Sequence, residues 1–525
     1  MVKSSTLIVP SAFEVLREKS GFLLWEQYGC MERSGTPFSE RLLNLIFFWC
    51  RLRPVQWLTN RCCVNKLRMQ KTVMVKEVVE AVGRYYREHK LEVAMDARQA
   101  LIYQKIYFRQ KAKSIRQKLT ALEDEAPSIK DPAKLQTLLF FYRRRALELN
   151  KQKQPVAIVD YLSRYYIEDM AADFDPAFLI AFRSIARHIF PHLVKSIRLS
   201  EEESGVFDQI RDLMGKAPVF ILPNHVSNAD HIPICFAING FNGLQPVIAA
   251  GANLFRGVSN WIMPRVNAYK IRREHLGRDS RWFQNLKWFH NPVYRQVHRE
   301  YLHYLWDHNE PFMFYIEGTR SRDGRIGKPK TGIMENLAGY VKNTGRQVYL
   351  VPVSLSYTIV PEDVDIEASR TGKNISEKDI FTQLAMLDKQ YAKLPDSAIH
   401  VHFSTPISYG SESGNINNAV IRLMESIGRG VVRSYTSLLA EAIMNMDVDS
   451  REEKSFTIQE VSDYFLEHFE LLPEVVDADV AHDIMMAIDA FCRKKFILQN
   501  SLTGDYQVEN MPLIQQYARR IAHLS

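Results

Sequence analysis

The sequence predicts an α/β fold in which a central, mostly parallel sheet with flanking helices lies between a helical N-terminal region and a helical C-terminal region. Three observations lead to this prediction. Helical spacing is common and strand-like alternation is scarce from Met1 to about Gly215. Beyond Gly215, short apolar runs bounded by Pro, Gly or Asn alternate with helix-length segments, as in a parallel sheet covered on both faces. From about Ser408 the chain reads as helical again.

Length and composition narrow the class of protein. The chain has 525 residues, of which 46% are hydrophobic and 24% charged, as in globular proteins. The 68 Lys and Arg against 60 Asp and Glu give +8, too small an excess for a polycation that coats nucleic acid. The six cysteines form no CxxC pair, so we expect neither a disulfide framework nor structural zinc. The sequence also lacks a signal-peptide pattern and any apolar run of ~18 residues, which favours a soluble or peripheral protein.

We expect residues 1–210 to form the helical N-terminal region. The stretch 78–118 has no proline, and 133–150 carries leucines along one helical face, so both are predicted helices. Residues 41–76 combine a strongly apolar run with several Lys and Arg and no acidic residue. That composition suits docking into the headgroups of an anionic bilayer. It suits equally a buried core helix that is followed by basic residues.

Residues 211–410 are the predicted catalytic domain, because chemistry-bearing residues cluster at the ends of its strands. The expected strands are 219–222, 247–250, 268–271, 312–316, 348–353 and 399–403. In parallel α/β sheets, reactive groups gather at the carboxyl ends of the strands.

The first strand is followed by His225 and, five residues later, Asp230. A neutral imidazole at such a turn can take a proton from an alcohol, and a carboxylate on its other nitrogen would fix the tautomer. The alternative is a turn held together by hydrogen bonds.

Three later strand ends carry further candidates. The strand 268–271 ends with Lys270, followed closely by Arg272 and Arg273. Arginine is suited to bidentate contact with phosphate oxygens, and the alternative is a pair of surface arginines at the end of a strand. The next strand leaves through Glu317-Gly318-Thr319-Arg320-Ser321-Arg322, with Lys328 and Lys330 beyond. Glycines and cations at this density favour a phosphate site over a solvated basic loop. The strand after that carries apolar side chains around Pro352, as core or as the wall of an apolar pocket.

These four segments, in this order, resemble the four sequence blocks of the glycerolipid acyltransferases: NHxSxxD, an arginine-bearing strand end, EGTRSR and VPV. The size and the long helical N-terminal region are similar to the large glycerol-3-phosphate and dihydroxyacetone-phosphate acyltransferases. The run Asn224-His225-Val226-Ser227 instead resembles the lysophosphatidate acyltransferase branch.

The resemblance implies transfer of a fatty acyl group from acyl-CoA or acyl-carrier protein to the sn-1 hydroxyl of glycerol-3-phosphate or dihydroxyacetone phosphate, early in phospholipid biosynthesis. Lysophosphatidate as acceptor and a catalytically silent lipid- or membrane-binding protein are the alternatives. No metal or other cofactor is implied. A membrane surface is the implied partner, with the protein peripheral or monotopic on its cytoplasmic face.

The resemblance also implies a role for each candidate. His225 removes the proton of the acceptor hydroxyl and Asp230 orients His225. The remaining residues bind substrate. Arg272 and Arg320, with Lys270, Arg273 and Arg322, hold the phosphate. Glu317 and Gly318 shape the floor, Thr319 is a further substrate-binding residue, and Pro352 lies near the acyl chain or the thioester.

Residues 411–525 are expected to form a helical C-terminal domain with a hairpin near 495–508. Helices followed by a hairpin also occur in winged-helix DNA-binding modules. Acidic residues outnumber basic ones between Arg451 and Ser525, however, whereas phosphate contacts need clustered Lys and Arg. We therefore expect no nucleic-acid binding and a domain that either braces the site or contacts a partner.

Overall fold

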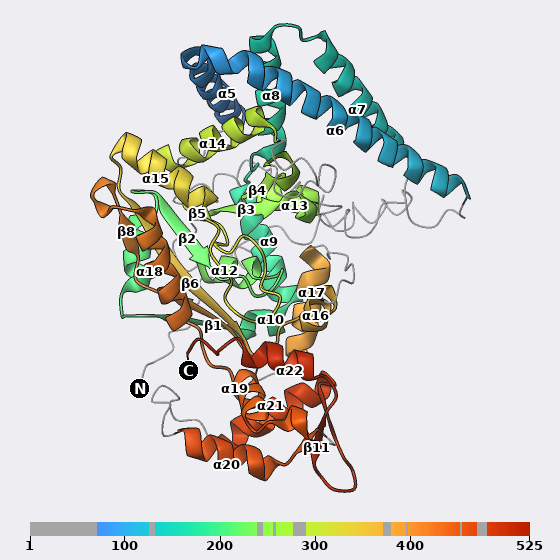
Figure 1. Cartoon of the computed structure of the whole chain (residues 1–525), viewed down its shortest axis with the longest axis vertical. Coiled ribbons are helices and arrows are strands. Elements are labelled where there is room, and N and C mark those ends of the chain that lie inside the picture. The colour runs from blue at the N-terminus through green and yellow to red at the C-terminus, as the bar shows by residue number, and fades with distance from the viewer. Residues whose placement is uncertain are drawn as a thin grey trace, which may run out of the picture.

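The computed structural model describes residues 71–124, 132–238, 245–255, 259–276, 290–370, 380–394, 397–451, 454–469 and 480–524. In this part of the chain, the central sheet lies between N-terminal helices and a C-terminal group of helices (Figure 1). The proposed membrane-docking segment 41–76 lies outside the described residues except for 71–76, which begin the first described helix.

The central sheet has eight strands in the order β1-β7-β6-β2-β5-β3-β4, and β8 pairs with β6. Its strands are β1 (Ile197–Glu201), β2 (Val219–Pro223), β3 (Val247–Gly251), β4 (Ala268–Ile271), β5 (Phe312–Met313), β6 (Val348–Tyr357), β7 (Ile399–Phe403) and β8 (Ile407–Tyr409). All pairs are parallel except β6 with β7 and β6 with β8. The predicted α/β class with a mostly parallel sheet is therefore confirmed.

Alternating side chains divide the core between the two faces of the sheet. In β2, Phe220 and Leu222 enter one apolar cluster, while Val219 and Ile221 enter the other. Successive strand residues point to opposite faces, so a strand that is apolar at every position must be covered on both sides.

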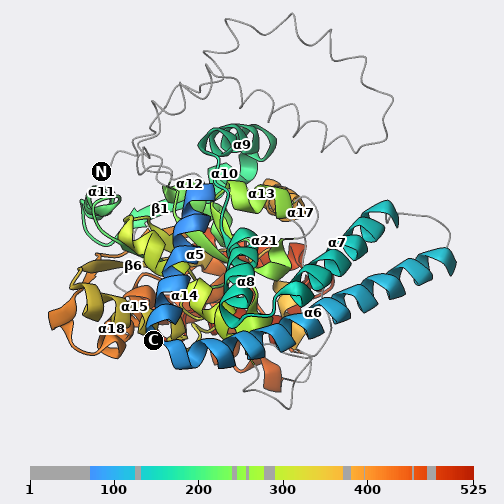
Figure 2. The same ribbon diagram turned by 90° about the horizontal axis from the view of Figure 1, so that it is seen from above.

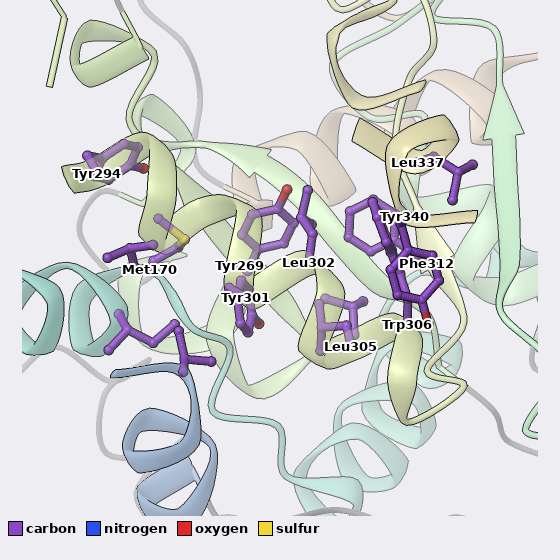
Figure 3. Close-up of a cluster of buried hydrophobic side chains, with 14 of the residues drawn as sticks. Met170, Tyr269, Tyr294, Tyr301, Leu302, Leu305, Trp306, Phe312, Leu337 and Tyr340 are labelled. Atoms are coloured by element: carbon purple, nitrogen blue, oxygen red, sulfur yellow. The ribbon is translucent and has the colours of Figure 1, made fainter. Parts of the chain in front are cut away.

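Helices supply both covers. They are α9 (Pro176–Ile189), α10 (Pro191–Ser196), α11 (Val206–Leu213), α12 (His231–Ile238), α13 (Ser259–Arg265), α14 (Pro292–Asp307), α15 (Gly332–Thr344), α16 (Asp363–Arg370), α17 (Ile380–Lys393) and α18 (Ile416–Arg429). Figure 3 shows one contact in this core: Trp306 of α14, Phe312 of β5 and Tyr340 of α15 lie together, and the Trp306 and Tyr340 rings meet edge to face at 5.2 Å. Edge-to-face pairs of this kind add stability beyond the area they bury.

The N-terminal helices extend one face of this core. They are α5 (Lys71–Glu88), α6 (Lys90–Asp124), α7 (Pro132–Lys151) and α8 (Pro155–Met170), and α5, α6 and α8 bury residues in the same cluster as α14. Helices α6 and α7 run side by side and project away from the body (Figure 2).

The C-terminal helices enclose an apolar cluster of their own. This region contains α19 (Tyr435–Asn445), α20 (Ile458–Phe469), α21 (Val480–Arg493) and α22 (Met511–Ala518), with a small antiparallel sheet of β9 (Ser455–Phe456), β10 (Ile497–Gln499) and β11 (Tyr506–Val508). Strands β10 and β11 form a hairpin that flanks residues 500–505.

Several strands differ from expectation: β8 and β9 were not predicted, β6 continues to Tyr357, and β1 and β5 differ as follows. Strand β1 lies where helix was predicted, because it is an edge strand with three exposed residues and shows no buried alternation. Strand β5 ends at Met313 instead of continuing to Ile316, since the chain there turns out of the sheet to form the loop around Gly318.

Candidate active site

His225 and Asp230 form a hydrogen-bonded pair on the turn that follows β2. The Nδ1 atom of His225 lies 2.8 Å from Oδ2 of Asp230. The histidine side chain is 17% exposed and the aspartate is fully buried. An aspartate that accepts from Nδ1 leaves Nε2 as the basic nitrogen of a neutral imidazole. No hydrogen bond to Nε2 is found among the described residues.

The carboxylate of Asp230 is held by three further donors. The backbone N–H groups of Val226 and Ser227 donate to it at 2.7 and 2.9 Å. The hydroxyl of Tyr357, at the end of β6, donates to Oδ1 at 2.9 Å. Four donors around one buried carboxylate fix its orientation toward His225.

A second carboxylate holds the backbone of His225. Glu317 accepts from the His225 N–H at 2.7 Å and from the Gly327 N–H at 2.5 Å. Burial raises the pKa of Glu317 above its ordinary value, while the two N–H donors lower it. The His225 ring also stacks on Tyr315, with ring centroids 4.0 Å apart. These contacts leave the imidazole little freedom to rotate.

Glycine is required twice in the loop that carries these groups. Gly318 has a φ of +67°, and a Cβ there would lie 2.8 Å from Cγ of Lys330. A Cβ on Gly327 would lie 2.6 Å from Oε2 of Glu317 and would displace the hydrogen bond. The loop therefore folds back on itself in a way that side chains at these positions would prevent.

His225 opens into a cleft of about 1560 Å³. Arg273, Gly318, Thr319, Arg320 and Arg322 also line it, together with apolar residues that include Ile248, Met263, Phe314 and Met386. Arg273 donates to the Gly318 carbonyl oxygen at 2.9 Å, so the second and third predicted segments meet at one place. A basic mouth joined to an apolar wall suits a ligand with both an anionic and an apolar part.

Lys270 and Arg272 do not line this cleft. The Arg272 guanidinium instead pairs with Asp169 of α8, at 2.7 Å from Nε, and Nζ of Lys270 lies 3.0 Å from the same carboxylate. Burial alone would raise the pKa of Asp169, but the two cations outweigh burial and lower it to about 2. These two predicted phosphate ligands are therefore engaged with the N-terminal helices.

Pro352 does not reach the cleft either, since it lies within β6 opposite Leu222 of β2. Asp230 and Glu317 lie behind His225 and act on it through hydrogen bonds. Of the predicted site residues, the structure thus brings His225, Arg273, Gly318, Thr319, Arg320 and Arg322 together at the cleft.

Sequence reasoning missed three side chains at or beside the site. Glu362 follows β6 and lines the cleft, where its Oε1 lies 3.6 Å from Nη1 of Arg320. The preference of reactive groups for strand ends could have pointed to it. Tyr357 and Asp169 gave no local signal, because their partners lie 127 and 103 residues away in the chain.

No group of three or more His, Cys, Asp or Glu side chains that could hold a metal ion is found within the described ranges. Among those same residues, every helix is too short or too polar to cross a bilayer.

Comparison with known proteins finds a family whose members are similar in sequence to the part of the chain that forms the cleft. The model of the acyltransferase family matches residues 204–356, which include His225, Asp230, Arg320 and Pro352. The chain is 26% identical over 265 residues to the glycerol-3-phosphate acyltransferase of Pseudomonas entomophila, a match that spans 50% of this chain and 29% of that protein. It is 30% identical over 203 residues to the enzyme of the same name from Ectopseudomonas mendocina, across 38% of this chain and 22% of that protein.

The chain thus covers less than a third of the length of either relative. The matched family segment begins just after β1 and ends within β6, so it contains the strand ends that form the cleft. The predicted resemblance is confirmed to this extent: residues 204–356 match the acyltransferase family, and the chain is similar to glycerol-3-phosphate acyltransferases over up to half of its length.

Proposed function

We propose that the protein transfers a fatty acyl group from an acyl thioester, carried by coenzyme A or acyl-carrier protein, to the sn-1 hydroxyl of glycerol-3-phosphate or dihydroxyacetone phosphate. The observation that carries the proposal is the His225–Asp230 pair, which faces a cleft bordered by Arg273, Arg320 and Arg322. The names of the curated relatives support the same acceptor class. No cofactor beyond the acyl thioester enters the proposal.

In the proposed reaction His225 is the general base. Its Nε2 accepts the hydroxyl proton while the acceptor oxygen attacks the thioester carbonyl carbon. When the carbon–sulfur bond breaks, the imidazolium returns that proton to the departing thiolate. Asp230, at 2.8 Å from Nδ1, stabilises the imidazolium in between. The acceptor attacks the donor directly, so no acyl-enzyme forms.

The phosphate of the acceptor lies in the basic mouth of the cleft. Arg320 is the main ligand in this proposal, because its side chain is 19% exposed and enters the cleft close to the turn that carries His225. Arg273 and Arg322 complete the mouth. Lys270 and Arg272 are left out, since both pair with Asp169 and neither lines the cleft.

An acceptor panel tests the proposal. Purified protein is given a labelled long-chain acyl-CoA, or an acyl-carrier-protein donor, with glycerol-3-phosphate, dihydroxyacetone phosphate or lysophosphatidate. We expect label on a small phosphate. Arg320→Met should raise its KM by about 10- to 100-fold, the loss of one hydrogen bond to a charged group, without changing the KM of the donor. Arg187→Met, an exposed arginine on α9, is the control.

Two outcomes would replace the proposal. Label on lysophosphatidate alone would make the protein an acyltransferase for that lysolipid. No transfer from either donor to any acceptor would indicate a lipid- or membrane-binding protein without catalysis.

We also propose that residues 41–76 attach the protein peripherally to the cytoplasmic face of a membrane, where acyl donors and products partition. The segment is apolar and basic and contains no acidic residue. Binding to anionic vesicles should weaken as salt is raised, because salt screens exposed charges. Salt-independent flotation, or none, would contradict this proposal.

A further inference from the structure

Glu362 links the two loops that border the cleft. Its carboxylate accepts from the Ser227 hydroxyl at 2.8 Å and from the Asn228 N–H at 2.6 Å, both on the turn that carries His225. The same carboxylate lies 3.6 Å from Nη1 of Arg320, on the loop of residues 317–330, which we call the basic loop. The position of Glu362 therefore affects the base and the phosphate ligand together.

The next residue, Asp363, is held by the C-terminal region. Its side chain is 1% exposed and pairs with Lys494 Nζ at 2.8 Å. The hydroxyl of Tyr517, on α22, donates to Asp363 at 2.8 Å and accepts from the Val360 N–H at 3.0 Å. Buried, mutually satisfied polar groups of this kind fix one arrangement. Asp363 does not line the cleft, so it does not itself meet the substrate.

Helix α22 also supports the basic loop. Gly324 has a φ of +93°, and a Cβ there would collide with the backbone carbonyl oxygen of Gln516. The loop backbone thus lies directly on α22, the helix that carries Tyr517. Helix α22 therefore supports both the segment that carries Glu362 and the loop that carries Arg320.

We infer that Asp363 is a positioning residue, through which the C-terminal region sets the geometry of the catalytic turn. Lys494 and Tyr517 hold Asp363, which fixes its neighbour Glu362 and, through it, the turn of His225. The catalytic consequence rests on the proposed function, whereas the physical coupling does not. Small displacements at a reacting centre cost large factors in rate, so a brace outside the cleft affects turnover.

Hydrogen exchange tests the coupling without any substrate. Tyr517→Phe keeps the ring and removes both hydrogen bonds of the hydroxyl. Tyr506→Phe is the matched control, because Tyr506 is 4% exposed in the same C-terminal core and its ring stacks on Phe456. In full-length protein, we expect exchange of the amides in 226–228 to rise roughly tenfold in Tyr517→Phe and not in the control. Exchange unchanged in both variants, with comparable unfolding temperatures, would overturn the inference.

Steady-state kinetics then distinguish an effect on the geometry of the catalytic turn from an effect on folding stability alone. Tyr517→Phe and Lys494→Met should each lower kcat by roughly tenfold per folded molecule, with the KM of the acyl thioester unchanged. Lys454→Met, which breaks an exposed pair with Asp449 at 2.9 Å, should leave kcat unchanged. A lower melting temperature with normal kcat would overturn the positioning role. If the wild-type protein transfers no acyl group, the proposed function fails, while hydrogen exchange still decides the coupling.

Discussion

Replacing Asp230 by Asn separates two roles of this carboxylate: orienting the imidazole and stabilising its charge. Oδ2 of Asp230 accepts from His225 Nδ1 and the Val226 N–H, Oδ1 accepts from the Tyr357 hydroxyl, and the Ser227 N–H reaches both oxygens at 2.9 and 3.0 Å. The hydroxyl can rotate to accept, but the N–H of Val226 cannot. We therefore expect the Asn amide group to turn its NH₂ toward Tyr357 and its oxygen toward His225, which preserves the tautomer.

The magnitude follows from the distance. Two full charges 2.8 Å apart attract by about 6 kcal/mol at an effective dielectric constant of ~20. If about half of a proton charge has reached His225 in the transition state, Asn forfeits about 3 kcal/mol, which is roughly 10²-fold in kcat. Folding stability should fall less, by about 1 to 2 kcal/mol, since a neutral hydrogen bond replaces a charge-assisted one.

Steady-state kinetics of Asp230→Asn, Tyr357→Phe and the double variant test this reasoning. In the double variant the buried Asn NH₂ loses its acceptor, so the amide is held less firmly, although the Val226 N–H still favours the same orientation. The combined loss of activity should then exceed the product of the two single losses. A double variant whose losses simply multiply, or an Asp230→Asn protein with nearly full kcat, would refute the account.

Three further predictions concern stability. Asp169→Asn should cost about 3 to 5 kcal/mol at neutral pH, because Lys270 and Arg272 lose their shared carboxylate and Arg272 keeps the longer 3.7 Å contact with Glu274. Because the pKa of Asp169 is lowered from 3.8 to about 2, the difference seen in urea unfolding should shrink as the pH falls through that window. Burial raises the pKa of Glu362 above 4.5, so folding favours its protonated form. The wild-type protein should therefore lose stability relative to Glu362→Gln as the pH rises from 4.5 through the raised pKa. A difference in melting temperature that stays constant with pH would contradict this. Gly324→Ala should lower the melting temperature because of its positive φ and its contact with Gln516, whereas Gly339→Ala, in a helix with open space around it, should be neutral or stabilise by about 0.5 to 1 kcal/mol; equal effects would refute the contact.

The sheet could be predicted from sequence because its central strands are buried on both faces. Strands β2 and β3 and the first half of β6 are short apolar runs, because strands buried on both faces are hydrophobic at nearly every position. Strand β1 could not be predicted in the same way, since an exposed edge strand needs no such pattern. The antiparallel pairing of β7 with β6 depends on tertiary packing and had no local signal.

The chemistry could be predicted where it depends on residues close in the chain. His225 and Asp230 are five residues apart, and their contact follows from the turn. Arg272 shows the limit of this reasoning. Its sequence suits phosphate binding, but a carboxylate more than a hundred residues away pairs with its guanidinium. Only the arrangement of helices around the sheet decides which of several arginines enters the cleft.

The central claim is direct acyl transfer with His225 as the base. Single-turnover transfer from labelled acyl-CoA to glycerol-3-phosphate tests it most directly, with His225→Ala beside the wild type and His188→Ala, an exposed histidine of α9, as control. The account predicts that label passes to the acceptor without appearing on protein, and that His225→Ala slows transfer by about 10²- to 10⁴-fold. Acylated protein that forms with donor alone and then delivers its label, or normal transfer by His225→Ala, would contradict it.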